Sequence, residues 1–129
     1  LKNSLICIEA SYATIESIRD IILGRVEAFV SIAHGIRTLG SAALSLCYIA
    51  MGAADVYHCD NLLPWDVAAG VLIIREAGGE VIDTYGGDFN FMEPKVLAVG
   101  NEKIATEVLN LIRTADKKTH HKRRLSNSH

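Results

Sequence analysis

The stretch that decides the fold of this chain is Trp65-Asp66-Val67-Ala68-Ala69-Gly70, which runs on through apolar residues to Glu76-Ala77-Gly78-Gly79. Its pattern predicts a helix over 65–77, because Pro64 suits a helix start and the paired glycines end it. Asp66 then lies in the first turn, where the helix dipole favours an acid. Two interpretations remain open: Asp66 caps the helix, or it is a rigidly held carboxylate that ligates Mg²⁺.

A second helix start is predicted at Gly40-Ser41-Ala42, ahead of an apolar run that ends at Gly52. The free N–H groups of a helix N-terminus point outward and bind an oxyanion or a hydroxyl. The structural alternative is that Ser41 only caps the helix and Gly40 only makes the turn. The residues by themselves leave both roles open.

Helical and strand-like segments alternate along the chain. This alternation predicts an α/β fold with layered helices and a mostly buried β-sheet. The expected strands are 5–8, 36–39, 54–60, 80–84 and 96–99, and the expected helices are 14–31, 41–51, 65–77 and 102–112.

Charge is distributed unevenly along the 129 residues. Residues 1–115 carry 8 Lys and Arg against 14 Asp and Glu, whereas residues 116–129 carry 5 against 1. An acidic body suits a cation site and disfavours nucleic acid as a partner. The basic end lacks apolar periodicity, so we expect one folded domain over 1–114 and a disordered tail over 115–129.

The three cysteines, Cys7, Cys47 and Cys59, are an odd number without paired spacing. This usage is typical of reduced thiols and predicts a cytoplasmic protein. No apolar run approaches the ~20 residues of a membrane span, so we expect no membrane-spanning segment.

Three further polar residues favour structural roles. His34 and His58 lack the i, i+4 partner of a metal-binding pair, so we interpret both as structural histidines. We assign Arg37 to a structural ion pair, with an acid such as Asp55, and leave it out of the site.

Taken together, the motifs resemble the inositol monophosphatase family of Mg²⁺-dependent, Li⁺-sensitive sugar phosphatases. The resemblance covers roughly residues 3 to 113 and includes W-D-x-A-A-G with the later E-A-G-G. It also includes His34-Gly35-Ile36-Arg37-Thr38-Leu39-Gly40-Ser41-Ala42-Ala43, Gly52-Ala53-Ala54-Asp55, Gly86-Gly87 and Val99-Gly100-Asn101.

The resemblance implies a fold, a site and an assembly. The fold is the C-terminal portion of the family's αβαβα sandwich, and the assembly is a homodimer. Asp66 is implied as a ligand of Mg²⁺ and as a substrate contact, and Gly40, Ser41 and Ala42 as contacts to the sugar hydroxyls. No residue of the chain is assigned as catalytic in its own right.

Two departures from the family pattern bear on function. The family's first metal ligands come from an upstream glutamate and from D-P-[IL]-D-G-T-x-N, yet this chain contains no Asp-Gly pair and does not begin with Met. We therefore expect a C-terminal half, whether as a fragment, a truncated gene model or a splice product, that is inactive alone. Cys59 stands where the family commonly has a glutamate that binds a substrate hydroxyl, and Asp60 is a candidate substitute.

The resulting hypothesis is Mg²⁺-dependent hydrolysis of a phosphate monoester, first of all inositol monophosphate, as part of a full-length enzyme. One alternative is the same chemistry on a different sugar or nucleotide monophosphate. The other is a non-catalytic product that acts by association.

Overall fold

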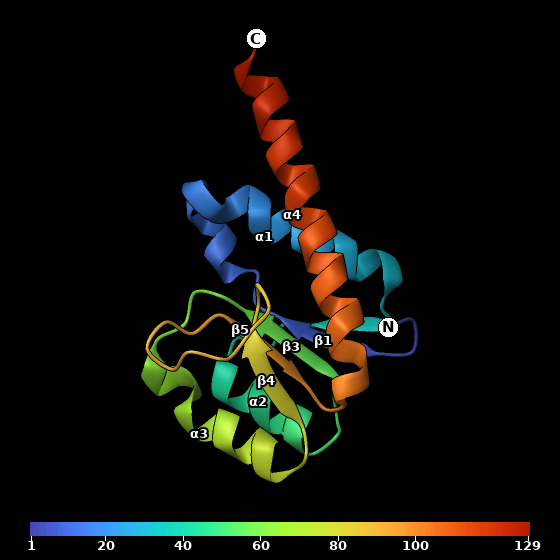
Figure 1. The fold of residues 1–129 in the computed structure, drawn as a ribbon, viewed down its shortest axis with the longest axis vertical. Coiled ribbons are helices and arrows are strands. Elements are labelled where there is room, and N and C mark those ends of the chain that lie inside the picture. Colours follow the sequence, from blue (N-terminus) through green and yellow to red (C-terminus); the bar gives the residue numbers. More distant parts are fainter.

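The computed structural model describes residues 1–129 as one mixed β-sheet between two layers of helices (Figure 1). The strands are β1 (Leu5–Ile8), β2 (Gly35–Arg37), β3 (Val56–Cys59), β4 (Glu80–Asp83) and β5 (Val96–Val99). The helices are α1 (Glu16–Ile32), α2 (Ala42–Ala50), α3 (Pro64–Glu76) and α4 (Ala105–Asn127), with short 3-10 turns at Ser11–Thr14 and Glu102–Ile104. The predicted α/β fold with layered helices is confirmed.

The sheet has the strand order β2-β1-β3-β5-β4. β1 runs parallel to both β2 and β3, and Ile6 lies opposite Ile36 on one side and Val56 on the other. β5 runs antiparallel to β3 and β4. Because the carboxyl ends of parallel strands meet at one edge of a sheet, the segments that follow β1, β2 and β3 gather there.

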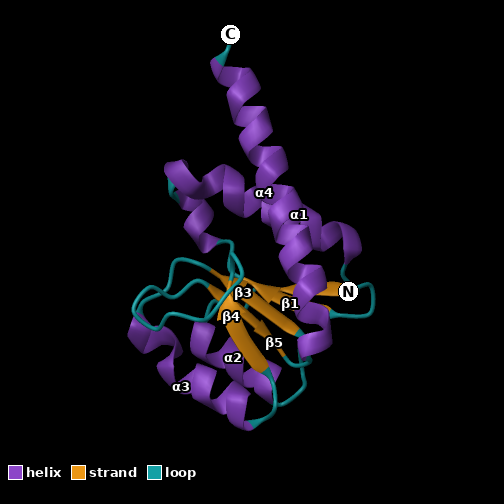
Figure 2. Cartoon of the chain, in the orientation of Figure 1, coloured by secondary structure: helices purple, strands orange, loops and turns teal.

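Each face of the sheet has its own core and its own pair of helices. α2 and α3 cover one face, and α1 and α4 cover the other (Figure 2). Successive residues of a strand point to opposite faces, so Val56 of β3 packs under α1 and α4 while Tyr57 packs under α2 and α3. Most strand residues are buried, with β3 and β5 buried along their whole length.

Both helix pairs cross closely at a glycine. A Cβ added to Gly70 of α3 would lie 2.6 Å from Cδ1 and 2.8 Å from Cβ of Leu46 on α2. A Cβ added to Gly24 of α1 would lie 2.5 Å from Oγ1 of Thr119 on α4.

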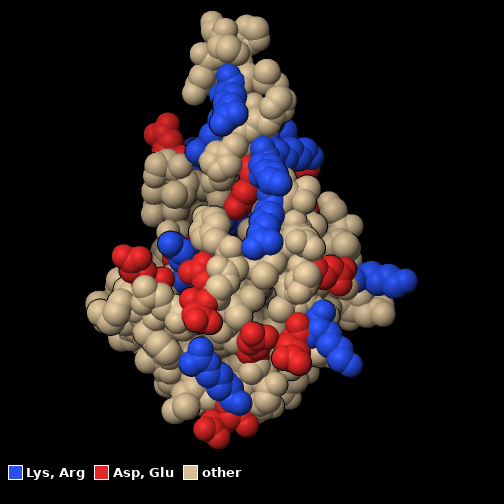
Figure 3. Space-filling model, in the orientation of Figure 1, with Lys and Arg blue, Asp and Glu red and all other residues tan.

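The C-terminal segment differs from the prediction. The expected helix end at Ile112 and the expected disorder over 115–129 are wrong, because α4 continues to Asn127. Ala115 and Thr119 are buried in this extension, and Arg123 pairs with Asp20 of α1. The Lys and Arg side chains that suggested a tail line the surface of this helix (Figure 3). None of the four α-helices combines the length and the apolar composition that a membrane-spanning helix needs.

Candidate functional site

A cleft of about 400 Å³ opens where α2 and α3 begin. It is lined by all four residues that the sequence analysis singled out, namely Gly40, Ser41, Ala42 and Asp66. Two helix N-termini at one cleft bring unpaired N–H groups and the positive ends of two helix dipoles together. The arrangement suits an anionic ligand.

Asp66 sits in the first turn of α3, after Pro64 and Trp65. Its Oδ2 accepts a hydrogen bond from the Leu63 N–H at 2.9 Å, and its own N–H donates to the Leu63 carbonyl at 2.9 Å. The capping interpretation is therefore confirmed for one oxygen. The cap also fixes the direction of Oδ1, which makes no hydrogen bond within the chain, so capping leaves a second carboxylate oxygen available.

The Gly40-Ser41 turn is held in a similar way. Gly40 has a φ of 73°, in the left-handed region that favours glycine. The Ser41 hydroxyl oxygen caps α2 by accepting from the Leu44 N–H at 3.2 Å. A hydroxyl group that accepts one bond can still donate its proton, so Ser41 keeps a donor for a ligand.

Sequence reasoning missed four polar residues that also line the cleft: Glu9, Ser11, Tyr12 and Tyr57. Oε1 of Glu9 accepts from the Gly40 N–H at 3.2 Å. Burial raises the pKa of Glu9, and the bond from Gly40 partly opposes that rise. A signal for Glu9 did exist, because it directly follows β1 and so belongs to the same sheet edge as the segment after β2.

The side chains of Cys59 and Asp60 point to opposite faces of the sheet, because the alternation of successive side chains along β3 continues at the residue that follows it. Cys59 is 4% exposed, on the α2 and α3 side, and is not among the residues that line the cleft. Burial raises the pKa of its thiol to about 11. Asp60 instead binds Nη1 of Arg25 at 2.6 Å and accepts from the Thr84 hydroxyl. The hypothesis that Asp60 replaces the missing acid therefore fails, since its carboxylate is engaged elsewhere.

Comparison with known proteins decides the family. The inositol monophosphatase family matches residues 1–117. The chain belongs to this family. Rat inositol monophosphatase 2 is 49% identical over 82 residues, which are 64% of this chain and 28% of the relative. Bovine inositol monophosphatase 1 is 40% identical over 108 residues, which are 83% of this chain and 39% of the relative.

A solved structure agrees with the fold. The extragenic suppressor protein suhB from Bartonella henselae superposes with a TM-score of 0.78 at 35% identity, over 87% of this chain and 42% of that one. The chain thus spans less than half the length of these three relatives.

The opposite face of this family fold holds a polar cluster around the buried Arg25 of α1, which is 4% exposed. Its guanidinium binds Asp116 of α4 at 2.7 and 2.8 Å and Asp60 at 2.6 Å. It also contacts Nε2 of His58 and the Tyr85 hydroxyl, both at 3.1 Å. We call these five residues the Arg25 cluster. Burial alone would lower the pKa of Arg25, but the two carboxylates raise it.

His58 is a structural histidine, as predicted. Its Nδ1 donates to the Val96 carbonyl at 3.0 Å, so Nε2 accepts from Arg25 and the ring is neutral. Burial lowers the pKa of His58. The predicted ion pair of Arg37 is absent, because Asp55 instead accepts from the Leu5 N–H at 2.8 Å and Arg37 forms no salt bridge.

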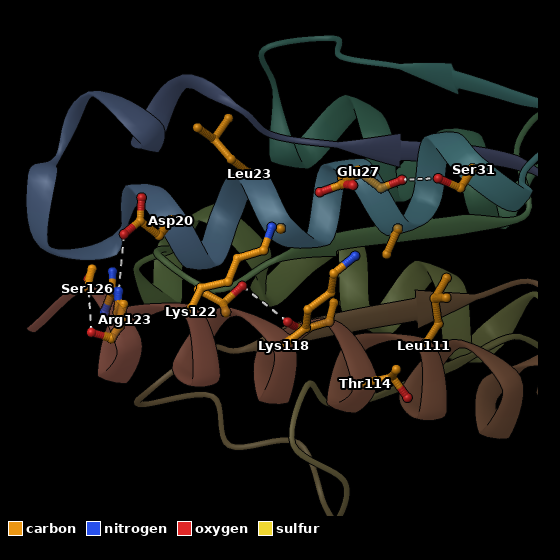
Figure 4. A pocket seen from close by; sticks show the side chains of 14 residues that line it. Asp20, Leu23, Glu27, Ser31, Leu111, Thr114, Lys118, Lys122, Arg123 and Ser126 are labelled. Atoms are coloured by element: carbon orange, nitrogen blue, oxygen red, sulfur yellow. Dashed lines mark hydrogen bonds and ion pairs between the residues drawn. The ribbon is translucent and has the colours of Figure 1, made fainter. Parts of the chain in front are cut away.

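A larger hollow, of about 530 Å³, lies between α1 and α4 (Figure 4). Asp20 and Glu27 line its α1 side, and Lys118, Lys122 and Arg123 line its α4 side. None of the predicted site residues reaches it. The smaller cleft at the helix starts is therefore the candidate site.

Proposed function

We propose that this chain supplies the substrate-binding wall and one metal ligand of a site that hydrolyses phosphate monoesters, with inositol monophosphate as the first expected substrate. The observation that supports it best is the single cleft lined by Gly40, Ser41, Ala42 and Asp66. Membership of the inositol monophosphatase family supports the reaction class.

Asp66 is the residue we expect to hold Mg²⁺. It offers one unbonded carboxylate oxygen on a rigid helix start, and Mg²⁺ is commonly bound by one or two carboxylates together with waters and substrate phosphate. No group of three or more His, Cys, Asp or Glu residues in the chain could hold a metal. The residues present can therefore supply one ligand of a metal site, and the remaining carboxylate ligands would have to come from residues other than these 129.

The chemistry of such a metal would be to polarise the phosphate and to lower the pKa of a bound water. The chain's own residues would orient the ester. N–H groups at the start of α2 and the Ser41 hydroxyl are placed to donate to oxygens of the ligand, and the N-terminus of α3 favours its negative charge. Each of these groups is fixed by backbone geometry, so little ordering is needed on binding.

We also propose a homodimer and a cytoplasmic location. The dimer rests on the family resemblance alone. The location is supported by Cys7, Cys47 and Cys59, which are all free thiols in the structure. Light scattering on the purified protein would test the dimer, and a fluorescent fusion would test the location.

The proposal is tested by phosphate release from inositol monophosphate, using the protein that carries this chain. We expect release in millimolar Mg²⁺ that stops when the metal is chelated. Hydrolysis that persists in full without divalent metal would contradict the metal role. No release under any metal condition would contradict the function and favour action by association.

A matched pair of variants tests Asp66 itself. Asp66→Asn keeps the size and the acceptor for the Leu63 N–H but removes the anionic ligand. Asp88→Asn makes the same change at an exposed acid outside the cleft. We expect only Asp66→Asn to weaken Mg²⁺ binding measured by calorimetry and to abolish turnover.

A further inference from the structure

Tyr57 carries a buried hydroxyl group that makes no hydrogen bond to any nitrogen or oxygen of the fold, and the Cys59 thiol beside it is a weak partner. Its side chain is 0% exposed, and its hydroxyl is one of two buried side-chain polar atoms that make no hydrogen bond. The other is the Ser45 hydroxyl, which does not line the cleft, whereas Tyr57 does. Buried hydroxyl groups are normally hydrogen-bonded, so an unpaired one at a ligand cleft calls for an explanation.

The direction of Tyr57 follows from β3. Tyr57 and Cys59 are two residues apart, so both point to the α2 and α3 side of the sheet, where the cleft opens. Position 59 is the one where the family resemblance implies a hydroxyl-binding acid, and here it holds a buried thiol. A thiol is a weak hydrogen-bond partner, so Cys59 does not replace that acid.

Glu9 offers a carboxylate at the same cleft. Only Oε1 is engaged, by the Gly40 N–H at 3.2 Å, and Oε2 makes no hydrogen bond. The bond to Gly40 ties the end of β1 to the turn that starts α2. Glu9 is half-buried, and burial raises its pKa, which is consistent with a partly desolvated position in the cleft.

We propose that Tyr57 and Glu9 together bind a ring hydroxyl of a polyol phosphate, and so replace the acidic residue that the family commonly has at the position of Cys59. The inference rests on the proposed function for the reaction, but the binding step does not require turnover. A ring hydroxyl both donates and accepts, so it matches one acceptor, the Glu9 carboxylate, and one donor, the Tyr57 hydroxyl. The pair selects esters whose leaving group carries hydroxyl groups.

The test compares two esters that differ only in ring hydroxyls, inositol monophosphate and cyclohexyl phosphate. Tyr57→Phe removes one oxygen atom that has no partner in the fold other than the weak Cys59 thiol. We expect it to lower kcat/KM for inositol monophosphate by about tenfold, mostly through KM, and to change that for cyclohexyl phosphate by less than about twofold. Glu9→Gln keeps the acceptor for Gly40 and should show the same selective loss.

Tyr48→Phe is the matched control, since Tyr48 is exposed on α2 and does not line the cleft. It should leave both esters unchanged. Equal losses on both esters in Tyr57→Phe, or no loss on either, would overturn the inference even if the protein is an active phosphatase.

Calorimetric binding of the two esters separates this inference from the proposed function. A protein that binds inositol monophosphate without hydrolysing it contradicts the function. If Tyr57→Phe then weakens that binding about tenfold and leaves cyclohexyl phosphate unchanged, the hydroxyl-binding pair still stands. If the unaltered protein binds neither ester, or Tyr57→Phe binds both as tightly as before, the pair is wrong.

Discussion

The two faces of the sheet use their polar groups in opposite ways. On the α2 and α3 side, Asp66, Ser41 and Glu9 each use one hydrogen-bonding position to hold the backbone and keep another unbonded. On the α1 and α4 side, the Arg25 guanidinium is engaged on all sides, by two carboxylates, a histidine and a phenol. Partly satisfied groups are available to a ligand, whereas fully satisfied groups serve the fold. The first side is therefore expected to govern activity and the second to govern stability.

The most direct test of this difference between the faces separates the capping role of Asp66 from the metal-binding role proposed for its unbonded oxygen. Both Asp66→Asn and Asp66→Ala should lower kcat by at least about 100-fold, because both remove a metal carboxylate. Only Asp66→Ala should also destabilise the fold, by about 1 kcal/mol, since alanine cannot accept from the Leu63 N–H. Steady-state kinetics and urea unfolding on the same samples measure the two effects. Activity within about tenfold of the parent in Asp66→Asn would mean that Asp66 is only a cap.

On the other face, Arg25→Met should act on stability. It leaves Asp60 and Asp116 without their cation, and breaking a buried ion pair from one side costs about 3–5 kcal/mol. Urea unfolding measures the loss. A second change, Asp116→Leu, should recover part of the lost stability, because it removes one of the two carboxylates left without a cation.

The control for Arg25 is Arg123→Met, which breaks the exposed pair with Asp20 between the same two helices. Exposed ion pairs contribute about 0–1 kcal/mol, so this variant should unfold near the parent. Similar losses in both variants would show that the α1 and α4 contact as a whole, and not the Arg25 cluster, stabilises this face.

The glycines at the two helix crossings, Gly70 and Gly24, compare the two faces through smaller changes in stability. Gly70→Ala should destabilise by about 1–3 kcal/mol, because its new Cβ meets the Cβ of Leu46, which is fixed to the α2 backbone. Gly24→Ala meets only the Thr119 hydroxyl, and alanine gains about 1 kcal/mol of helix propensity, so the net change should be smaller. In a Thr119→Ala background, Gly24→Ala should become stabilising. Thermal unfolding of the four variants checks the order.

The smallest expected effect is a pH dependence of stability that arises from the Arg25 cluster. Burial lowers the pKa of His58 below its ordinary value of 6.5. At pH values below 6.5 the unfolded chain therefore binds a proton that the folded chain does not bind, and the free energy of unfolding falls as pH falls. Burial alone would raise the pKa of Asp60, but His58 and Arg25 lower it, so Asp60 adds a loss only in more acidic solution, below about 3.8. The groups facing His58 are Arg25 on α1, Asp116 on α4, Asp60 after β3 and Thr84 after β4.

His58→Gln should flatten the stability profile between pH 6.5 and 5, with a slope change of at most about 1.4 kcal/mol per pH unit for one proton. Unfolding by urea at several pH values measures it. An unchanged slope would mean that His58 does not titrate between the folded and unfolded states.

The sequence predicted the α2 and α3 side well because its signals are local. Pro64, Asp66 and the Gly78-Gly79 pair mark the two ends of one helix within a few residues, and β1 and β5 appear as short apolar runs. Helix caps and strand periodicity need no knowledge of the rest of the chain. The opposite faces of Cys59 and Asp60 were also predictable from strand alternation, although Asp60 was considered as a substitute acid.

The α1 and α4 side escaped prediction because its partners are distant in sequence. Arg25 and Asp116 are 91 residues apart, and Arg123 and Asp20 are 103 apart. Without those partners, the composition after Asp116 is that of a disordered segment, and the extension of α4 to Asn127 cannot be inferred. Glu9 and Tyr57 were missed for a related reason, since neither belongs to a motif and only the sheet brings them to the cleft.

The last turns of α4 have a consequence for the lifetime of the protein. No residue of α4 after Thr119 is buried, so the amides of residues 120–127 should exchange with solvent through local opening, long before the sheet unfolds. Lys122, Arg123 and Arg124 lie in this stretch, and each is a cleavage point for trypsin-like proteases. Cleavage after Lys122, the first of the three, would remove Arg123 from the wall of the α1 and α4 hollow together with its ion pair to Asp20, while Arg25 and Asp116 keep the remaining helix in place.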